Sequence, residues 1–384
     1  MTRLIELLIS LAIVAALFLI VGVVLPSHRH VSEKVESNRK QTIVFDVVNG
    51  FGRFHDWNAL AARDPAIQMK ISGPEAGKGA KLEYDSKADG IGSGSWTITD
   101  SKPKTRVDFA IENDDFGSNK RSTISLSPTG RNNRNVEIEQ TYDVDYGFNL
   151  LGRYAGLYVK SYMGDDIKIG LARLTNLLAG IPNQDYGIAN SRLTGLQLAQ
   201  IPAEHVLFVT SGSVKRDDAS IQASINANQE WIKRTMAANG LTAVGPVRII
   251  TNELGRDTYN FDIAQVVRKG AAAAPAAGDA ADGETAPAAA PAPAAAPAPG
   301  PAAGAALNVT TQGPVKYALN PAGRAVRGEF SGYFAELDAM RNAIRAWAAV
   351  RGYEVIDRPY EVYTGGVAPA FTENGKFEMY WPVK

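Results

Sequence analysis

A long uncharged apolar run near the N-terminus constrains this chain more than any other feature. The run from Leu7 to Leu25 reads LLISLAIVAALFLIVGVVL and contains no charged residue. As a helix rising about 1.5 Å per residue it would be about 28 Å long, which matches the hydrocarbon core of a bilayer. We therefore predict a transmembrane anchor over residues 4–25.

Two other interpretations of this run stay open. A cleaved signal peptide would have an apolar core of about 7–15 residues and a small-x-small cleavage site, whereas this run leads into PSHRHVSEK. A buried helix of a soluble domain would show a polar face, which the run lacks. The short tail before the run favours a body outside the cytoplasm, so we expect a single-pass protein of a bacterial inner membrane with its soluble part on the periplasmic side.

The charge and cysteine content exclude several classes of function. Forty Lys and Arg residues balance forty Asp and Glu residues without forming a basic block, so we expect no nucleic-acid partner. The sequence has no cysteine, which excludes disulfides, thiolate nucleophiles and cysteine-bound zinc. It also has no His-Glu-x-x-His, Gly-x-Ser-x-Gly or phosphate-loop spacing, so we predict no metal, no cofactor and no catalytic residue.

Composition divides the rest of the chain into two domains and an insert. Residues 270–306 are almost entirely Ala, Pro and Gly, and repeated Ala-Pro steps forbid a continuous helix, so we predict a disordered, solvated tether. A helical pattern ends near Gly180 and a new alternating pattern starts after it. We therefore expect a first domain over residues 31–183 and a second over residues 190–384, which the tether interrupts.

Alternating strands and one long helix are expected in the first domain. Residues 106–113 and 122–127 alternate between apolar and polar side chains, and residues 150–180 show helical spacing with Gly164 and Gly170 as weak points. The alternating segments predict an antiparallel sheet, and the helical spacing predicts a long helix that lies across it. The inward face of the strand RNVEIEQTYDVDY is formed by Val136, Ile138, Gln140, Tyr142, Val144 and Tyr146.

Together with the segment TIVFDVVNGFGRFHDWNAL (residues 42–60), this order of elements resembles the SRPBCC superfamily of polyketide cyclases and START lipid-transfer domains. The resemblance implies a helix-grip fold, in which an antiparallel sheet wraps around a helix and leaves an apolar cavity for a lipid, steroid or polyketide. The candidate cavity walls are Trp57, Trp96, Phe109 and Tyr142. Ordinary core packing is the alternative role for each of these four residues.

An internal repeat organises the second domain. Residues 231–267 and 343–383 each contain an amphipathic helix that ends at Asn-Gly or Arg-Gly, a strand preceded by proline, a polar loop and a final strand. The strands AEHVLFVTSG and GRAVRGEFSG precede the two helices. We therefore predict a duplicated β-α-β-β domain around a pseudo-twofold axis, and an α+β fold class for the chain.

This repeat is similar to the gyrase-inhibitor-like (GyrI-like) effector-binding domain, which also ends some AraC-type transcription activators. The resemblance implies a ligand cleft between the repeats, with aromatic walls and a buried glutamate for bulky apolar cations. The family's Pro-x-Glu-x-Tyr segment matches PYEVY, so it assigns Glu361 and Tyr363 to the ligand. Tyr333, Tyr380 and Trp381 are further candidates for the cleft walls.

The alternative role for Glu361 is an ion pair with Arg358, Arg324 or Arg327 on a solvated edge, and for the aromatic residues it is plain core packing. We expect a membrane-anchored binding protein for small hydrophobic or cationic-amphipathic molecules and not an enzyme. The alternative is an enzyme, either polyketide-cyclase-like or a small-molecule hydrolase that uses Glu361 as acid or base. A third interpretation is an interaction module, which large exposed apolar patches would reveal.

Overall fold

The structure is a computed structural model that describes residues 2–188, 191–270 and 305–384. The chain divides into two compact units. Unit 1 comprises Met1–Gly187 with Ala349–Gly352, and unit 2 comprises Ile188–Ala348 with Tyr353–Lys384. Most of the predicted tether, residues 271–304, lies outside the described residues.

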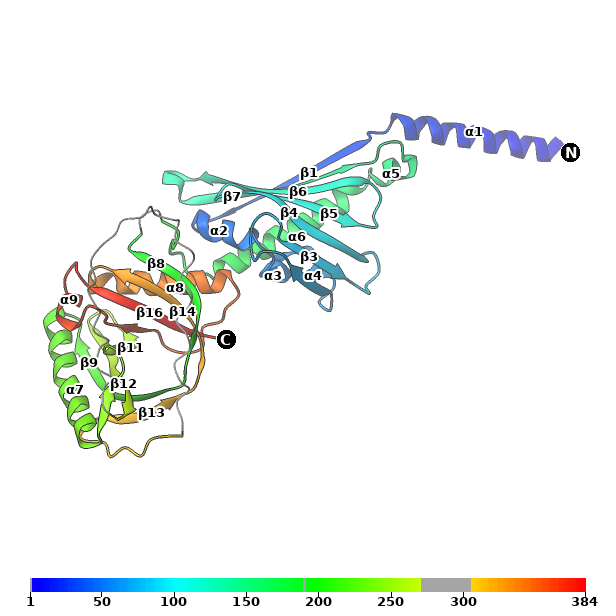
Figure 1. Cartoon of the computed structure of the whole chain (residues 1–384). Coiled ribbons are helices and arrows are strands. Elements are labelled where there is room, and N and C mark those ends of the chain that lie inside the picture. Colours follow the sequence, from blue (N-terminus) through cyan, green and yellow to red (C-terminus); the bar gives the residue numbers. More distant parts are fainter. Residues whose placement is uncertain (1, 189–190, 271–304) are drawn as a thin grey trace, which may run out of the picture. The chain divides into compact units, whose positions relative to one another are not determined.

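Unit 1 is built on a seven-stranded antiparallel sheet with the order β1-β7-β6-β5-β4-β3-β2 (Figure 1). In β7 every second residue is buried, which confirms the alternation read from the sequence. The strands are β1 (His28–Ser37), β2 (Gln68–Ser72), β3 (Lys81–Asp85), β4 (Ser93–Lys102), β5 (Arg106–Asn113), β6 (Ser118–Thr129) and β7 (Asn135–Asp145).

The long helix α6 (Val159–Ala179) packs against β1, β7 and the short helices of unit 1. Its buried side includes Ile167, Leu171, Leu174 and Leu178, as the helical spacing predicted. The other helices of unit 1 are α1 (Thr2–Val24), α2 (Gln41–Val48), α3 (Phe54–Trp57), α4 (Ala59–Arg63) and α5 (Leu150–Ala155), with a 3-10 turn η1 at Arg131–Asn133.

The predicted continuous helix over residues 150–180 is interrupted at a different place than expected. It runs unbroken through Gly164 and Gly170 and is divided between α5 and α6, next to Gly156. A Cβ atom at Gly156 would lie 2.7 Å from the ring of Tyr146, so this close packing requires glycine. The ring of Tyr146 therefore packs closely against the residue at which α5 ends.

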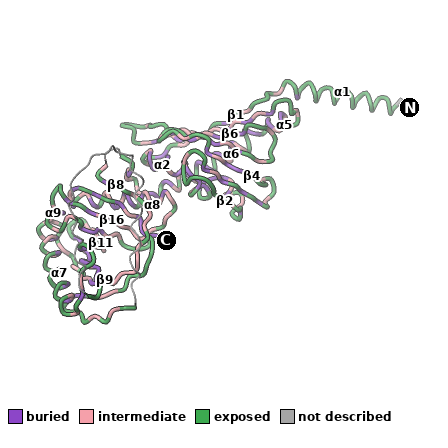
Figure 2. The backbone as a smooth tube through the Cα atoms, viewed as in Figure 1, coloured by how far each residue is buried: buried purple, intermediate pink, exposed green. Residues whose placement is uncertain are grey.

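Helix α1 is exposed along almost its whole length (Figure 2). Its segment Arg3–Val24 is the one helical segment among the described residues that is long and apolar enough to cross a membrane. Signal sequences also have this property. This agrees with the apolar run found in the sequence.

Unit 2 contains a nine-stranded antiparallel sheet with the order β13-β9-β12-β11-β15-β16-β14-β8, and β10 pairs with β12. The mixed helix and strand fold with antiparallel sheets is therefore confirmed for both units. The strands are β8 (Leu193–Ile201), β9 (Glu204–Lys215), β10 (Leu241–Ala243), β11 (Arg248–Leu254), β12 (Thr258–Lys269), β13 (Lys316–Asn320), β14 (Gly323–Ser331), β15 (Tyr360–Val362) and β16 (Lys376–Val383). The helices are α7 (Asp218–Ala238), α8 (Leu337–Val350) and α9 (Val367–Ala370), with a 3-10 turn η2 at Phe334–Glu336.

Helix α7 ends as its sequence predicts. Its C-cap is Asn239, and Gly240 takes a left-handed conformation with φ of 61°. The helix starts at Asp217, whose side chain accepts a hydrogen bond from the backbone N–H of Ser220 at 2.8 Å. Local capping chemistry therefore sets both ends of this helix.

Candidate functional site

A cavity of about 380 Å³ lies in unit 1 between α6 and the sheet. Its wall on α6 comes from residues three or four positions apart, which share one face of a helix. The wall on the sheet comes from inward positions of β3 to β7. The residues that line the cavity include Trp57, Asn58, Arg63, Tyr84, Trp96, Ile111, Asn113, Asp115, Ser122, Gln140, Tyr142, Tyr162, Asp165, Asp166, Ile167 and Gly170.

Aromatic side chains form much of the cavity wall. Trp57 and Trp96 both line it, and both contact Phe54 with ring centroids 5.3 Å apart. Phe109 packs edge to face against Trp96 at 5.6 Å, in the aromatic cluster behind the wall. This apolar surface favours the burial of an apolar molecule.

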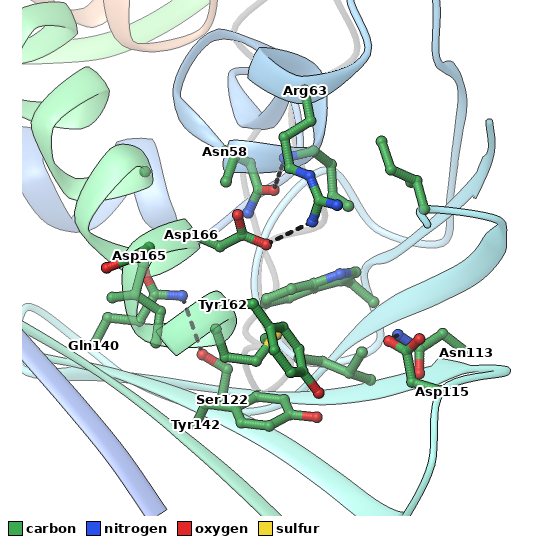
Figure 3. A pocket seen from close by; sticks show the side chains of 18 of the residues that line it. Asn58, Arg63, Asn113, Asp115, Ser122, Gln140, Tyr142, Tyr162, Asp165 and Asp166 are labelled. Atoms are coloured by element: carbon green, nitrogen blue, oxygen red, sulfur yellow. Dashed lines mark hydrogen bonds and ion pairs between the residues drawn. The ribbon is translucent and has the colours of Figure 1, made fainter. Parts of the chain in front are cut away.

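Two buried polar atoms in the cavity wall have no hydrogen-bond partner among the described residues. They are the indole Nε1 of Trp57 and the amide Oε1 of Gln140, and both side chains are almost fully buried. The amide Nε2 of Gln140 donates to Ser122 at 3.2 Å (Figure 3), which holds the amide group in place. Because unpaired buried polar groups cost free energy, this wall contains one donor and one acceptor whose hydrogen-bonding capacity the described residues leave unsatisfied.

An ion pair closes one end of the cavity. Arg63 Nη1 lies 3.0 Å from Asp166 Oδ2, and Figure 3 shows the pair beside Asn58. Burial raises the pKa of the Asp166 carboxyl above its ordinary value, and Arg63 offsets only part of this rise. Asp166 is therefore easier to protonate than an exposed aspartate.

Phenol, amide and carboxylate groups form the other end. The hydroxyls of Tyr142 and Tyr162 point toward Asn113 and Asp115 (Figure 3), and burial raises the pKa of both tyrosines. Lys120 holds this end together, because its ammonium donates to the carbonyl oxygens of Asn113 at 2.9 Å and Asp115 at 2.6 Å. The phenols stay protonated at neutral pH and offer neutral hydrogen bonds.

Unit 2 has a cleft of about 350 Å³ on a different face from the predicted glutamate. Tyr360 in β15 lines the cleft and stacks on Tyr380 with ring centroids 5.0 Å apart. Arg248 lines it too, with its guanidinium 5.2 Å from the centre of the Tyr360 ring and both Nη atoms bound to Glu204 at 2.5 and 2.9 Å. Burial raises the pKa of Tyr360 to about 12.

Residues 28–179 match the family model described as polyketide cyclase / dehydrase and lipid transport. This segment is a polyketide cyclase/START-like domain. The SRPBCC resemblance is thereby confirmed for the part of the chain that holds the first cavity.

Several solved structures are similar to the chain. Norcoclaurine synthase from Thalictrum flavum is 13% identical, with 40% of this chain and 94% of that chain covered and a TM-score of 0.33. A START superfamily protein from Mycobacterium smegmatis is 17% identical, with 39% and 97% covered and a TM-score of 0.30. The EcmrR C-terminal domain is 16% identical, with 50% and 97% covered and a TM-score of 0.34. A search of curated proteins finds no significant match.

The four aromatic residues predicted for the START-like domain lie in one region. Trp57, Trp96 and Tyr142 line the cavity, and Phe109 lies in the cluster that supports Trp96. Their roles toward a ligand stay predictions.

In unit 2, Glu361 is fully buried and paired with Arg341, and not with Arg358, Arg324 or Arg327 on a solvated edge. Arg341 of α8 donates from Nε to Oε1 at 2.7 Å and from Nη2 to Oε2 at 2.9 Å. Tyr363 is also fully buried, and its hydroxyl has no hydrogen-bond partner in the described part of the chain. The predicted ligand role of Glu361 would therefore have to compete with an existing buried ion pair.

The other three predicted aromatic residues make separate contacts. Tyr333 donates its hydroxyl hydrogen to Asp218, Tyr380 donates to Glu378 at 2.6 Å, and the Trp381 indole donates to the carbonyl oxygen of Asp357 at 2.7 Å. The structure therefore does not gather them around Glu361.

Sequence reasoning missed most of the polar lining of the START-like cavity. Gln140 carries a readable signal, because an amide stands on the inward face of an otherwise apolar strand. Arg63 and Asp166 are 103 residues apart, so no local pattern joins them.

Within the described residues, no group of three or more His, Asp or Glu side chains could hold a metal ion.

Because the pKa of Asp166 is raised, we expect the stability of the variant Asp166→Asn to increase relative to that of the wild type as pH rises. The folded pKa exceeds that of the unfolded chain, so wild-type folding takes up a proton and its stability falls as pH rises through the folded pKa. The asparagine side chain does not titrate, so the variant does not lose stability in this way as pH rises. In urea unfolding from acidic to neutral pH, the unfolding free energy of Asp166→Asn should therefore gain on that of the wild type, whereas a constant difference would contradict the assignment.

Proposed function

We propose that this chain is a membrane-anchored binding protein for small, largely apolar molecules that carry a hydrogen-bonding group. One observation carries the proposal: the START-like cavity has aromatic walls and, among the described residues, an unpartnered donor at Trp57 and acceptor at Gln140. A cavity of about 380 Å³ falls in the size range of small-molecule sites. Burial of about 200 Å² of apolar ligand surface would contribute about 5 kcal/mol.

Membrane attachment is assigned to α1 in this proposal. The support is its length, its apolar composition and its exposure, since the described residues leave nearly all of the helix uncovered. A lipid bilayer is a suitable solvent for such a helix. The periplasmic location of the soluble part stays a prediction.

Unit 2 is proposed to be a GyrI-like domain with a second ligand site in its cleft. The order β9-β12-β11 on one side of the sheet centre mirrors β14-β16-β15 on the other, and a helix follows β9 and β14 in each half. The support for a ligand site is the cleft with Tyr360 in its wall.

The charged residues that line the cleft are three carboxylates and three arginines, the latter being Arg248, Arg324 and Arg358, so its formal charge is balanced. The carboxylates that line it are Glu204, Asp262 and Asp357, and each accepts a hydrogen bond from an arginine. No free carboxylate is left among the described lining residues to attract a cation. We therefore propose a neutral aromatic ligand for the cleft, in place of the cationic one that the sequence resemblance implies.

An enzyme is the second candidate function, and Asp166 is the observation in its favour. A carboxyl with a raised pKa inside an apolar cavity suits general acid–base chemistry. The family description covers cyclases, dehydrases and lipid transport alike, so it does not decide between the two candidates. Turnover of a bound compound that is lost in Asp166→Asn, with binding retained, would favour the enzyme.

A pair of probes tests the binding proposal. Naphthol has a hydroxyl group that can donate a hydrogen bond to Gln140 or accept one from Trp57. Naphthalene has the same rings without a hydroxyl group. Wild-type protein in nanodiscs should prefer naphthol, and Gln140→Leu should reduce this preference by about 3–10-fold, because one hydrogen bond contributes about 0.5–1.5 kcal/mol. Fluorescence titration against empty nanodiscs measures both dissociation constants.

The matched control is Gln68→Leu, which changes the same side chain at an exposed position of the START-like domain. It should leave the ratio of the two dissociation constants unchanged. An equal preference in the wild type and in Gln140→Leu would count against the proposed role of this amide.

A further inference from the structure

Helix α5 is held against the C-terminal part of α1 by two adjacent side chains. Tyr154 donates its hydroxyl hydrogen to the carbonyl oxygen of Phe18 at 2.8 Å, and the two rings stack with centroids 4.4 Å apart. Arg153 Nη1 donates to the carbonyl oxygens of Gly22 (3.3 Å), Val23 (2.7 Å) and Leu25 (3.1 Å).

The charge of Arg153 is accommodated by carbonyl groups. Its Nε and Nη2 atoms donate to the carbonyl oxygen of Gly147 at 2.8 and 2.6 Å, in addition to the three carbonyl groups at the end of α1. The C-terminus of a helix carries partial negative charge, so a buried cation is stable there. Asn149 caps α5 by accepting from the backbone N–H of Gly152 at 2.9 Å. Each nitrogen of the Arg153 guanidinium thus donates to a backbone carbonyl group.

The contact with Phe18 places α5 at a defined depth when α1 spans a bilayer. Helix α1 has 23 residues and is about 34 Å long, only slightly longer than the hydrocarbon core of about 30 Å. Phe18 lies six residues before Val24, which is about 9 Å along the helix axis. Even if all the excess length is placed at this end, the level of Phe18 lies about 5 Å inside the hydrocarbon, a depth typical of interfacial helices.

The side chains that α5 and its flanking loops expose are suited to that depth. We call this set the interface patch: Phe148, Leu151, Leu157 and Tyr158, with exposed fractions of 95%, 61%, 50% and 68%. Between Asp145 and Asp165 the sequence has no acidic residue, and its two charges are Arg153 and Lys160. Apolar and aromatic side chains with nearby cations are typical of segments that lie at a lipid surface.

We propose that the interface patch inserts into the surface of the phospholipid bilayer that α1 crosses. The occupant is lipid because the patch adjoins an apolar helix already long enough to span a membrane. This inference rests on the proposed anchoring by α1 and adds a second, non-spanning contact.

The interface patch also leads directly to the START-like cavity. Tyr158 precedes α6, and Tyr162, one helical turn later, lines the cavity while remaining partly exposed. Inserted lipid-facing residues would hold this end of the cavity at the bilayer surface. Molecules dissolved in the membrane could then enter the cavity without crossing bulk water.

Single-cysteine labelling tests the inference on the full chain, which has no cysteine of its own. The variants Phe148→Cys and Leu151→Cys report on the interface patch, Leu11→Cys on the middle of α1, and Ile71→Cys on an exposed apolar position of β2. Each is labelled with an environment-sensitive fluorophore and reconstituted in vesicles of phosphatidylcholine and phosphatidylglycerol. Lipids with a doxyl quencher near the headgroup or deep in the acyl chain then report depth.

We expect the headgroup-proximal quencher to reduce emission at Phe148 and Leu151 at least about twofold more than at Ile71, and the deep quencher to act at Leu11. Quenching at Leu11 without quenching at Phe148 and Leu151 would overturn the docking inference and leave the anchor intact. Absence of quenching at Leu11 would overturn the anchor, and the docking inference with it. Binding of naphthol is measured separately, so either result is distinguishable from failure of the cavity proposal.

Discussion

Replacing Arg341 by methionine is expected to destabilise unit 2 by about 3–5 kcal/mol, the typical cost of leaving one member of a buried ion pair without its partner. Glu361 is fully buried and Arg341 is almost so, and both guanidinium contacts are shorter than 3 Å. In Arg341→Met the carboxylate would have to stay charged in an apolar site or take up a proton. Urea unfolding and amide hydrogen exchange of β15 and α8 in the full chain measure the loss.

Two further variants make this result specific. Arg341→Met/Glu361→Leu removes both charges and should recover most of the loss, because an apolar pair of similar volume often replaces a buried ion pair at little cost. Lys233→Met breaks an exposed pair with Glu230 on α7 and should cost less than about 1 kcal/mol. If Arg341→Met is no more harmful than Lys233→Met, the pair does not have the structural role that we assign to it.

The second large effect is expected from closing the START-like cavity from both sides. Ile111 on β5 and Ile167 on α6 both line it. The double variant Ile111→Trp/Ile167→Trp places two indole rings in the space of the ligand and should weaken naphthol binding at least tenfold, which corresponds to about 1.4 kcal/mol. Fluorescence titration of the full chain in nanodiscs gives the dissociation constants.

The matched control for this pair is Ile111→Val/Ile167→Val, which leaves the cavity open. It should keep the dissociation constant within about threefold of the wild type, although each Ile→Val change costs about 0.5–1.5 kcal/mol of stability. A thermal unfolding transition in both variants verifies that they fold. If the tryptophan and valine variants bind naphthol with equal affinity, naphthol binds outside the START-like cavity.

The parts of the fold that follow from local chemistry could be predicted from the sequence. The alternation in β7 depends on one buried face, and the end of α7 depends on Asn239 and Gly240. The edge strands β8 and β13 were not predicted, because their pairing with β14 and β9 is formed between distant segments. The separation of α5 from α6 was not predicted either, and Gly156 between them packs against the ring of Tyr146.

The sites were harder to predict because their polar groups meet through the fold. The partner of Glu361 nevertheless left a signal, since Arg341 follows Leu337 by four residues and precedes Ile344 by three, on the buried face of α8. A charged residue on such a face requires a buried partner. For Arg63 and Asp166 no comparable pattern exists, because α4 and α6 meet only in the folded domain.

Native mass spectrometry of the full chain, released from nanodiscs after equilibration with naphthol, tests most directly whether the START-like cavity holds a small molecule. The cavity account predicts that the wild type retains one more naphthol per chain than Ile111→Trp/Ile167→Trp. A wild-type chain that retains no naphthol, or as many molecules as the filled variant, would contradict it.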